Sequence, residues 1–172
     1  MAEFRSLRGV EPFGPFIPLL RSPALLSRVS ALGEYLRFRN ALPPGLSEFV
    51  ILITAAHWKQ QYEWNLHAPI ALKAGVAAST IEALAAGRRP PDLRADEEAL
   101  YELCLGVHDR QPVADAVYNR ALSAVTEQGV IDAIGLCGYY AMLAMVLNTE
   151  RHTALSTGPE AGAESPPAGY PR

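Results

Sequence analysis

Charged residues are scarce in this sequence. They make up 19% of its 172 positions, and the net charge is −3. The basic residues are scattered rather than gathered in one stretch, so we expect no nucleic-acid partner. The hydrophobic fraction is 49%, which is more than a typical monomer carries. Part of this excess is therefore expected to lie in a subunit interface.

Cysteine is scarce as well. The only two, Cys104 and Cys137, are far apart in the sequence and occupy apolar patterns with helical spacing. Buried thiols of low reactivity are common in such settings, so the sequence predicts no disulfide. A chain that does not depend on disulfides is typical of the reducing cytoplasm, where we expect this protein to be found.

Several motifs that identify enzyme classes are missing. There is no Gly-rich nucleotide loop, no Gly-x-Ser-x-Gly elbow and no His-Glu-x-x-His zinc motif. These absences argue against nucleotide-dependent enzymes and the commonest hydrolases. Residues 1–20 lack a continuous apolar run, so no signal peptide is expected. The longest nearly apolar run, 129–147, includes Asp132 and three glycines, which favours a buried or interface helix over a membrane span.

No window alternates polar and apolar residues as a strand would, so the sequence predicts an all-α fold of six to eight helices in one domain. We expect this domain to cover residues 22–155. Residues 1–21 form a Pro/Gly-rich arm, because the prolines between Val10 and Pro23 forbid a regular helix and suggest an extended segment. Residues 156–172 are poor in large apolar side chains and are expected to be a disordered tail.

The helix boundaries are predicted from capping and breaking residues. Ser47 is expected to cap the helix that follows a Pro-Pro-Gly break. A capping-box spacing at Ser79 predicts the start of a short helix. Pro112 is expected to begin a further helix, and Gly129 to separate it from the last one, 130–147.

The stretch from Glu48 to His67 concentrates polar and aromatic groups in an otherwise apolar, helix-forming region. It holds two glutamates, two of the four histidines and both tryptophans. Glu63 and His67 are four residues apart, so on a helix they share one face and can touch. Glu48 is nineteen residues before His67, which on one straight helix places it about 100° away around the axis. A bend within 58–61, dividing the stretch into two packed helices, is needed to bring Glu48 to the same pocket.

A carboxylate one turn from a histidine suits proton transfer, because it fixes the imidazole tautomer. The Glu63–His67 pair can also be a purely structural contact that orients two helices. A third possibility is a metal site of nitrogen and oxygen ligands that includes Glu48 and His57. The spacing matches no zinc motif, so we expect no metal. The aromatic side chains of the stretch can line a ligand pocket or belong to the core.

The run Tyr-Glu-Trp-x-x-His at 62–67, with Glu48 and Gln60 before it, resembles the carboxymuconolactone decarboxylase and alkylhydroperoxidase D-like family. The resemblance covers 16–151 and includes the segments 19–23, 36–39, 139–140 and 147–148. The redox branch of that family carries a Glu, a Cys-x-x-Cys pair and a His at fixed spacing. Gln60 and Glu63 replace the two cysteines here, so the chain looks like the decarboxylase-type branch.

The resemblance implies a function and a set of roles. Thiol peroxide reduction needs a thiolate with a resolving partner, which these positions lack, so a peroxidase is disfavoured. The implied activity is that of a cofactor-independent lyase, removing carbon dioxide from a small carboxylated lactone or oxo acid. In this interpretation His67 gives and takes the proton, Glu63 orients it or acts as a second acid–base group, and Glu48 is a further hydrogen-bond partner. Substrate contacts are expected from Tyr62, Gln60, His57 and Trp64. Arg39 and Arg37 are weaker candidates for binding the substrate carboxylate.

Two other functions fit the same residues. An isomerase or hydrolase acting on a related compound would also need a proton shuttle near a carbonyl. A non-catalytic ligand-binding protein would use Glu63 and His67 as a structural pair. Members of the family commonly form trimers or hexamers, so the resemblance implies a homo-trimer or homo-hexamer. The last helix, with Gly135 and Gly138, and the N-terminal arm are expected to make its contacts, and no membrane partner is expected.

Overall fold

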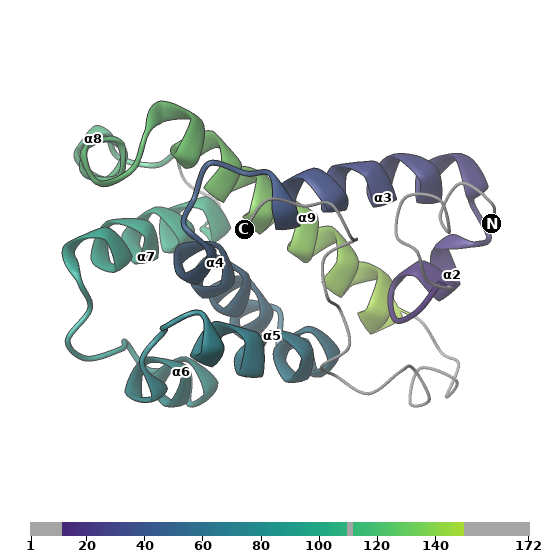
Figure 1. The fold of residues 1–172 in the computed structure, drawn as a ribbon, viewed down its shortest axis with the longest axis horizontal. Coiled ribbons are helices and arrows are strands. Elements are labelled where there is room, and N and C mark those ends of the chain that lie inside the picture. Colours follow the sequence, from purple (N-terminus) through teal and green to yellow (C-terminus); the bar gives the residue numbers. More distant parts are fainter. Residues whose placement is uncertain (1–11, 110–111, 150–172) are drawn as a thin grey trace.

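The secondary structure of this protein is helical in the part that the structure describes. The computed structural model describes residues 12–109 and 112–149, and within these ranges it contains eight helices and no strand. The predicted all-α class is therefore confirmed (Figure 1). In chain order the helices are α2 (Phe16–Leu19), α3 (Pro23–Phe38), α4 (Pro44–His57), α5 (Gln61–Lys73), α6 (Ala78–Ala85), α7 (Ala95–His108), α8 (Asp115–Ala124) and α9 (Glu127–Thr149). The predicted tail, 156–172, lies outside the described residues.

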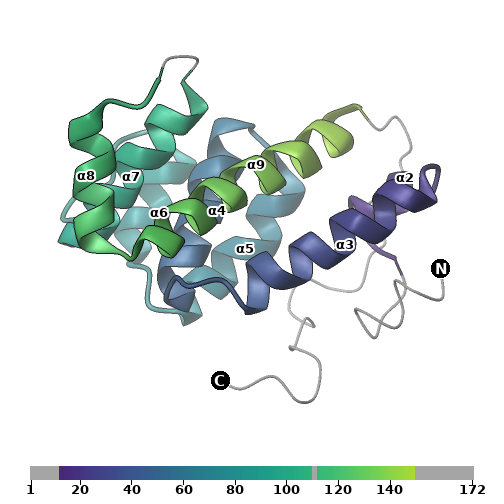
Figure 2. The same ribbon diagram turned by 90° about the horizontal axis from the view of Figure 1, so that it is seen from above.

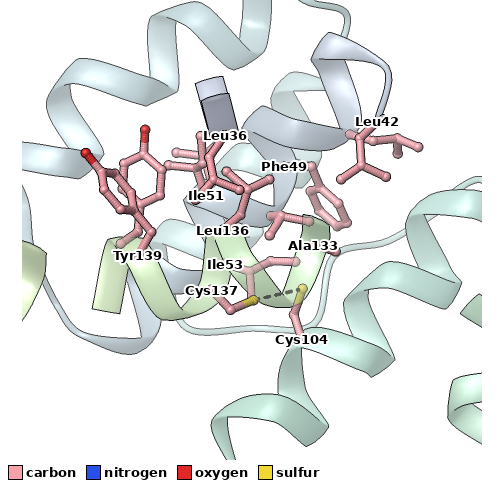
Figure 3. Packing of buried hydrophobic residues seen from close by; sticks show 14 of the residues in the cluster. Leu36, Leu42, Phe49, Ile51, Ile53, Cys104, Ala133, Leu136, Cys137 and Tyr139 are labelled. Carbon is pink, nitrogen blue, oxygen red and sulfur yellow. Dashed lines mark hydrogen bonds between the residues drawn. The ribbon is translucent and has the colours of Figure 1, made fainter. Parts of the chain in front are cut away.

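Helix α4 forms the centre of the core. Its sequence is a nearly continuous apolar run, and a helix that is apolar on every side must be buried on every side. Phe49, Val50 and Leu52 have no exposed surface. The helix contacts α5, α6, α7 and α9. Figure 3 shows its side chains packed among those of the loop after α3 and of α9, including Leu42 and Leu136.

The longest helix, α9, runs diagonally across the domain from α8 to the region of α2 (Figure 2). By length and composition it could cross a membrane, but 56% of its apolar window is buried inside the fold. Its one buried carboxylate, Asp132, accepts hydrogen bonds from the Tyr35 hydroxyl at 3.0 Å and the Ala41 backbone N–H at 2.8 Å. These contacts identify α9 as a core helix of this domain, as the sequence predicts for 129–147.

Small residues let α9 approach its neighbours within the chain. A side-chain carbon on Gly135 would lie 3.1 Å from Leu36 of α3, and one on Gly129 would lie 3.2 Å from Leu42. Gly135 therefore serves packing inside the subunit. A side-chain carbon on Gly138 would meet nothing within 4 Å, and this residue is exposed.

The predicted starts of two helices, α4 and α6, were wrong. Helix α4 begins at a proline, and α6 begins without a side-chain cap. Helix α4 starts at Pro44, where a missing N–H costs nothing in the first turn. Ser47 lies inside this turn and its hydroxyl donates to the side chain of Asn40. Helix α6 starts at Ala78 without any side-chain cap, so the pattern at Ser79 is not a capping box.

The last two boundaries also differ from the prediction. Helix α8 begins at Asp115, three residues after Pro112, and buries Ala121 while Leu122 is 38% exposed. Gly129 lies inside α9 rather than before it. The Gly129 N–H donates to the Thr126 hydroxyl at 3.0 Å, so Thr126 caps the start of α9. The sequence prediction places the boundary at Gly129 instead.

The N-terminal segment does contain a helix, contrary to the prediction for Val10 to Pro23. In the four-residue helix α2, Pro15 occupies the N-cap position and Pro18 falls in the first turn, where backbone N–H groups have no helical acceptor. Phe16 and Leu19 are buried against the body of the domain, with α2 contacting α3 and α9. The segment thus packs on its own chain; residues 1–11 lie outside the described part.

The predicted bend within the central stretch is confirmed. Helix α4 ends at His57, Lys59 adopts a positive φ of 50°, and α5 starts at Gln61. The Gln60 side chain caps α5 by accepting a hydrogen bond from the Tyr62 backbone N–H at 2.8 Å. The chain therefore turns back on itself, and α5 packs along α4.

Candidate functional site

The return of α5 against α4 brings His67 to Glu48. The Nδ1 atom of the His67 ring lies 2.7 Å from Oε2 of Glu48, a hydrogen-bond distance between side chains nineteen residues apart. His67 is 1% exposed and Glu48 is 8% exposed. A buried carboxylate in this position selects the tautomer with hydrogen on Nδ1. The second ring nitrogen, Nε2, is then the atom that can exchange a proton.

Glu63 lies on the other side of the same ring. It is one turn before His67 on α5, it is 2% exposed, and its Oε2 is 3.7 Å from Nε2 of His67. This separation is longer than a hydrogen bond but leaves the carboxylate beside the exchangeable nitrogen. The imidazole is therefore held between two buried carboxylates, one at each nitrogen.

Two tyrosines of α9 complete the surroundings of the ring. Tyr140 meets His67 edge-on with ring centres 5.0 Å apart, and Tyr139 meets Tyr140 in the same manner at 5.3 Å. Burial raises the pKa of Tyr140 well above its ordinary value, and the nearby Glu63 and Glu48 add to the rise while Arg37 opposes it. Tyr140 thus remains a neutral phenol that can donate a hydrogen bond but does not act as a base.

A small cavity adjoins this histidine. Its volume is about 20 Å³, and a space of about 10–15 Å³ is the least that holds one water molecule. The lining comes from four parts of the chain: Phe13, Pro15 and Phe16; Arg37 of α3; Tyr62, Glu63, Leu66 and His67 of α5; and Tyr139, Tyr140 and Leu143 of α9. Acidic, basic and phenolic groups therefore meet in an otherwise apolar space.

The N-terminal segment covers this cavity, and a glycine makes the close cover possible. Gly14 has a positive φ of 49°, and a side-chain carbon on it would lie 2.5 Å from the ring of Tyr62. Only glycine lets the backbone lie on this ring without displacing it. Sequence analysis missed this lining. The aromatic residues Phe13 and Phe16 beside prolines were the available signal, since large apolar side chains in a short segment need a surface to bury them.

The structure places four of the predicted site residues together. Glu48, Glu63 and His67 form the contacts described above, and Tyr62 lines the same cavity. Their roles in a reaction stay a prediction. Arg37, one of the two arginine candidates, also lines the cavity.

The other predicted substrate contacts lie elsewhere. Gln60 caps α5 and donates from its amide to Asn148 at 2.7 Å, and with Trp64 it lines a separate hollow of about 540 Å³ near α6. Arg39 forms an ion pair with Glu34. His67 belongs neither to this hollow nor to this ion pair. Gln60, Trp64 and Arg39 therefore do not line the cavity at His67.

His57 also points away from the site. Its ring stacks on that of His108 with centres 4.5 Å apart, and burial, together with the neighbouring His108, lowers the pKa of His57. The four-residue metal site considered from the sequence is therefore not assembled. Within 12–109 and 112–149, no group of three His, Cys, Asp or Glu side chains has the arrangement of a metal site.

Gln60 and Glu63, the two positions that the resemblance pairs with cysteines, have different surroundings. Gln60 is a helix cap, whereas Glu63 faces the histidine. Only position 63 therefore places its side chain beside His67.

Comparison with known proteins agrees with this geometry at the level of the family. A search of curated proteins gives no match. The family model described as "Carboxymuconolactone decarboxylase family" matches residues 23–103. That segment includes α3 to α5 and therefore Glu48, Glu63 and His67. Over this segment the chain is similar to the carboxymuconolactone decarboxylase family.

Proposed function

We propose that this protein is a cofactor-independent lyase that removes carbon dioxide from a small carboxylated lactone or a related oxo acid. The observation that carries the proposal is the His67 ring, held between Glu48 and Glu63 at the wall of a cavity that Arg37 also lines. The match of residues 23–103 to a family named for a decarboxylase supports an enzymatic function at that coarser level. No thiol occupies positions 60 or 63, which favours acid–base chemistry over peroxide reduction.

The proposed reaction needs one proton to move. The bond between the carboxyl carbon and its neighbour breaks, carbon dioxide leaves, and the electron pair passes to the carbonyl of the lactone as an enolate. Protonated His67 then donates a proton from Nε2 to carbon, and the ring regains it from solvent. Glu48 holds the ring orientation through Nδ1, and Glu63 lies beside Nε2 where it can share the proton.

Binding of the substrate carboxylate is assigned to Arg37. A guanidinium makes two-point, charge-assisted hydrogen bonds to a carboxylate, which an apolar lining strengthens. Arg39 is excluded from this role because its ion pair with Glu34 lies outside the cavity lining.

Substrate access requires the cover to move. A space of about 20 Å³ has room for a water molecule but not for a lactone acid. Phe13, Pro15 and Phe16 form the cover, and the segment that carries them is joined to the domain by α2 and its contacts with α3 and α9. We therefore propose that this segment opens to admit the substrate and closes to exclude water.

The alternatives from the sequence remain as second candidates. An isomerase or hydrolase would use the same histidine, and the product distinguishes it from a lyase. The 1% exposure of His67 and the small cavity favour the third candidate, a non-catalytic protein with a structural Glu–His pair. Absence of any turnover in the assay below, with the fold intact, would support that candidate.

The test compares the two arginines with carboxymuconolactone as the probe, following release of carbon dioxide. Arg37→Gln should raise KM by about 10- to 100-fold, since a hydrogen bond to a charged group contributes about 1.5–3 kcal/mol. The value of kcat should change less, because Arg37 binds the substrate rather than moving the proton.

Arg39→Gln is the matched control and should leave KM within about twofold, since Arg39 pairs with Glu34 and does not line the cavity of His67. Equal effects of the two substitutions would contradict the assignment of Arg37. If the wild-type protein releases no carbon dioxide but converts the probe to another product, the isomerase or hydrolase candidate takes the place of the lyase.

We also propose that the protein assembles as a homo-trimer or homo-hexamer. Leu25 and Leu32 of α3, 43% and 47% exposed, project from one side of that helix, and Ile131 of α9 is 58% exposed. Such exposed apolar side chains are suited to a subunit contact. Light scattering at micromolar concentration should give three or six times the chain mass of 18.6 kDa. A monomer would contradict this proposal without affecting the assignment of the histidine site.

A further inference from the structure

The two cysteines, distant in sequence, meet in the core. Cys104 on α7 and Cys137 on α9 have their sulfur atoms 3.6 Å apart, as the dashed line in Figure 3 marks. Both are free thiols, and their exposed fractions are 0% and 1%. The prediction that they are buried is confirmed. Their close contact was not foreseen, since it depends on how α7 packs against α9.

Polar side chains surround this pair on one side. Cys104 is the hydrogen-bond partner of the Cys137 sulfur, and His108 and Thr54 lie close enough to lower the pKa of Cys137. The Thr54 hydroxyl also lies 3.1 Å from Nε2 of His108, whose ring stacks on the exposed His57. Polar side chains in contact therefore extend from the surface at His57 to Thr54 in the core. None of these residues lines the cavity at His67.

The surroundings shift the pKa values of the two thiols in opposite directions. The hydrogen bond between the two sulfurs lowers the pKa of Cys137 to about 5, against the opposing effect of burial, and His108 and Thr54 lower it further. The same hydrogen bond, with burial, raises the pKa of Cys104 well above its ordinary value. A thiolate beside a thiol is the arrangement in which one sulfur reacts and the other supplies a proton and then resolves the product.

We propose that Cys104 and Cys137 form a redox-active pair that a small peroxide oxidises to a reversible intramolecular disulfide. The Cys137 thiolate attacks one oxygen of the peroxide, the O–O bond breaks, and the leaving oxygen takes a proton, giving Cys137 sulfenic acid and water. The Cys104 sulfur then attacks the sulfenic sulfur, with loss of its proton and release of a second water. The pair loses two electrons and two protons in total, which the peroxide accepts.

The geometry limits both the product and the oxidant. Closing the bond requires the sulfurs to approach from 3.6 Å to about 2.05 Å, a change within reach of small rotations about the two side chains. Burial of both sulfurs excludes a protein disulfide as the oxidant, because it could not reach them. Hydrogen peroxide, the smallest peroxide, needs only a local opening beside His108 to reach them.

The full-length reduced protein tests this proposal. It is treated with hydrogen peroxide, then denatured in N-ethylmaleimide and measured by intact mass spectrometry. We expect a species lighter by two hydrogen atoms that carries no maleimide, a peptide in which Cys104 is joined to Cys137, and full recovery of both thiols after dithiothreitol. Two alkylated thiols after peroxide, a disulfide between chains, or sulfinic acid without a disulfide would each overturn the proposal.

Serine variants assign the two roles. In Cys104→Ser, Cys137 should accumulate as sulfenic acid that reacts with dimedone. In Cys137→Ser, Cys104 should not react with dimedone and should stay alkylatable after the same peroxide treatment. Circular dichroism checks that each variant is folded. If a variant is unfolded, the mass spectrometry of the wild-type protein described above decides the proposal. The reverse pattern, with dimedone labelling of Cys104 alone, would overturn the assignment of Cys137 as the reacting sulfur.

Discussion

Replacing His67 by glutamine should lower kcat for carbon dioxide release from carboxymuconolactone by about 10²- to 10⁴-fold, the usual contribution of a general acid or base. Glutamine keeps a polar side chain of similar length, able to hydrogen-bond Glu48, but it cannot carry a proton at neutral pH. The ring contact with Tyr140 is lost, so the thermal midpoint must be measured beside the rate to separate catalysis from stability.

A matched control for this substitution lies in the same stretch. His57→Gln changes a histidine that stacks on His108, outside the cavity of His67, and should leave kcat within about twofold. If His67→Gln turns over at the wild-type rate while remaining folded, His67 is not the proton donor and the proposed mechanism fails. The pH dependence of kcat/KM in the unmodified protein should also contain a limb that the glutamine variant lacks.

Replacing Glu48 by glutamine should produce the second largest loss of activity. Its carboxylate holds the Nδ1–H tautomer of His67 across a distance of 2.7 Å. An amide can turn its NH₂ group toward Nδ1, which would place the ring hydrogen on Nε2 and prevent that atom from accepting a proton. We expect kcat to fall by about 10²-fold or more, since the loss of an orienting carboxylate in a Ser-His-Asp enzyme costs about 10⁴-fold.

The control is a buried glutamate with a structural role. Glu97 is 4% exposed and caps α7 through the Arg94 backbone N–H at 3.0 Å. Replacing Glu97 by glutamine should lower the free energy of unfolding without changing kcat. A Glu48→Gln variant that loses stability but keeps its pH profile and its kcat would show that Glu48 only supports the fold.

Much of the fold could be predicted because helices depend on local spacing. The clearest case is the bend after His57. The spacing from Glu48 to His67 required two packed helices, and the Gln60 cap and the positive φ of Lys59 provide the turn. The helix starts at Ser47, Ser79 and Gly129 were wrong because several residues near each boundary offer equivalent signals, and packing decides among them.

Part of the candidate site could be predicted for the same reason. The Glu63–His67 pair follows directly from a four-residue spacing on one helix, and the structure places its atoms 3.7 Å apart. The choice between Arg37 and Arg39 was different. Arg37 lies in the last turn of α3 and Arg39 follows the end of that helix, so their side chains have different surroundings. Only the packing of α3 beside α9 determines which guanidinium lines the cavity.

The sequence by itself determined the helical class, the resemblance to a family, and a histidine with two acidic residues on adjoining helices, because these depend on periodicity and on motifs within short stretches. The tertiary structure alone decided that Phe13 and Phe16 cover the cavity and that Cys104 meets Cys137. Each of these contacts joins elements distant in the chain. Their positions follow from how whole helices pack around α4, and no local pattern of residues encodes such a meeting.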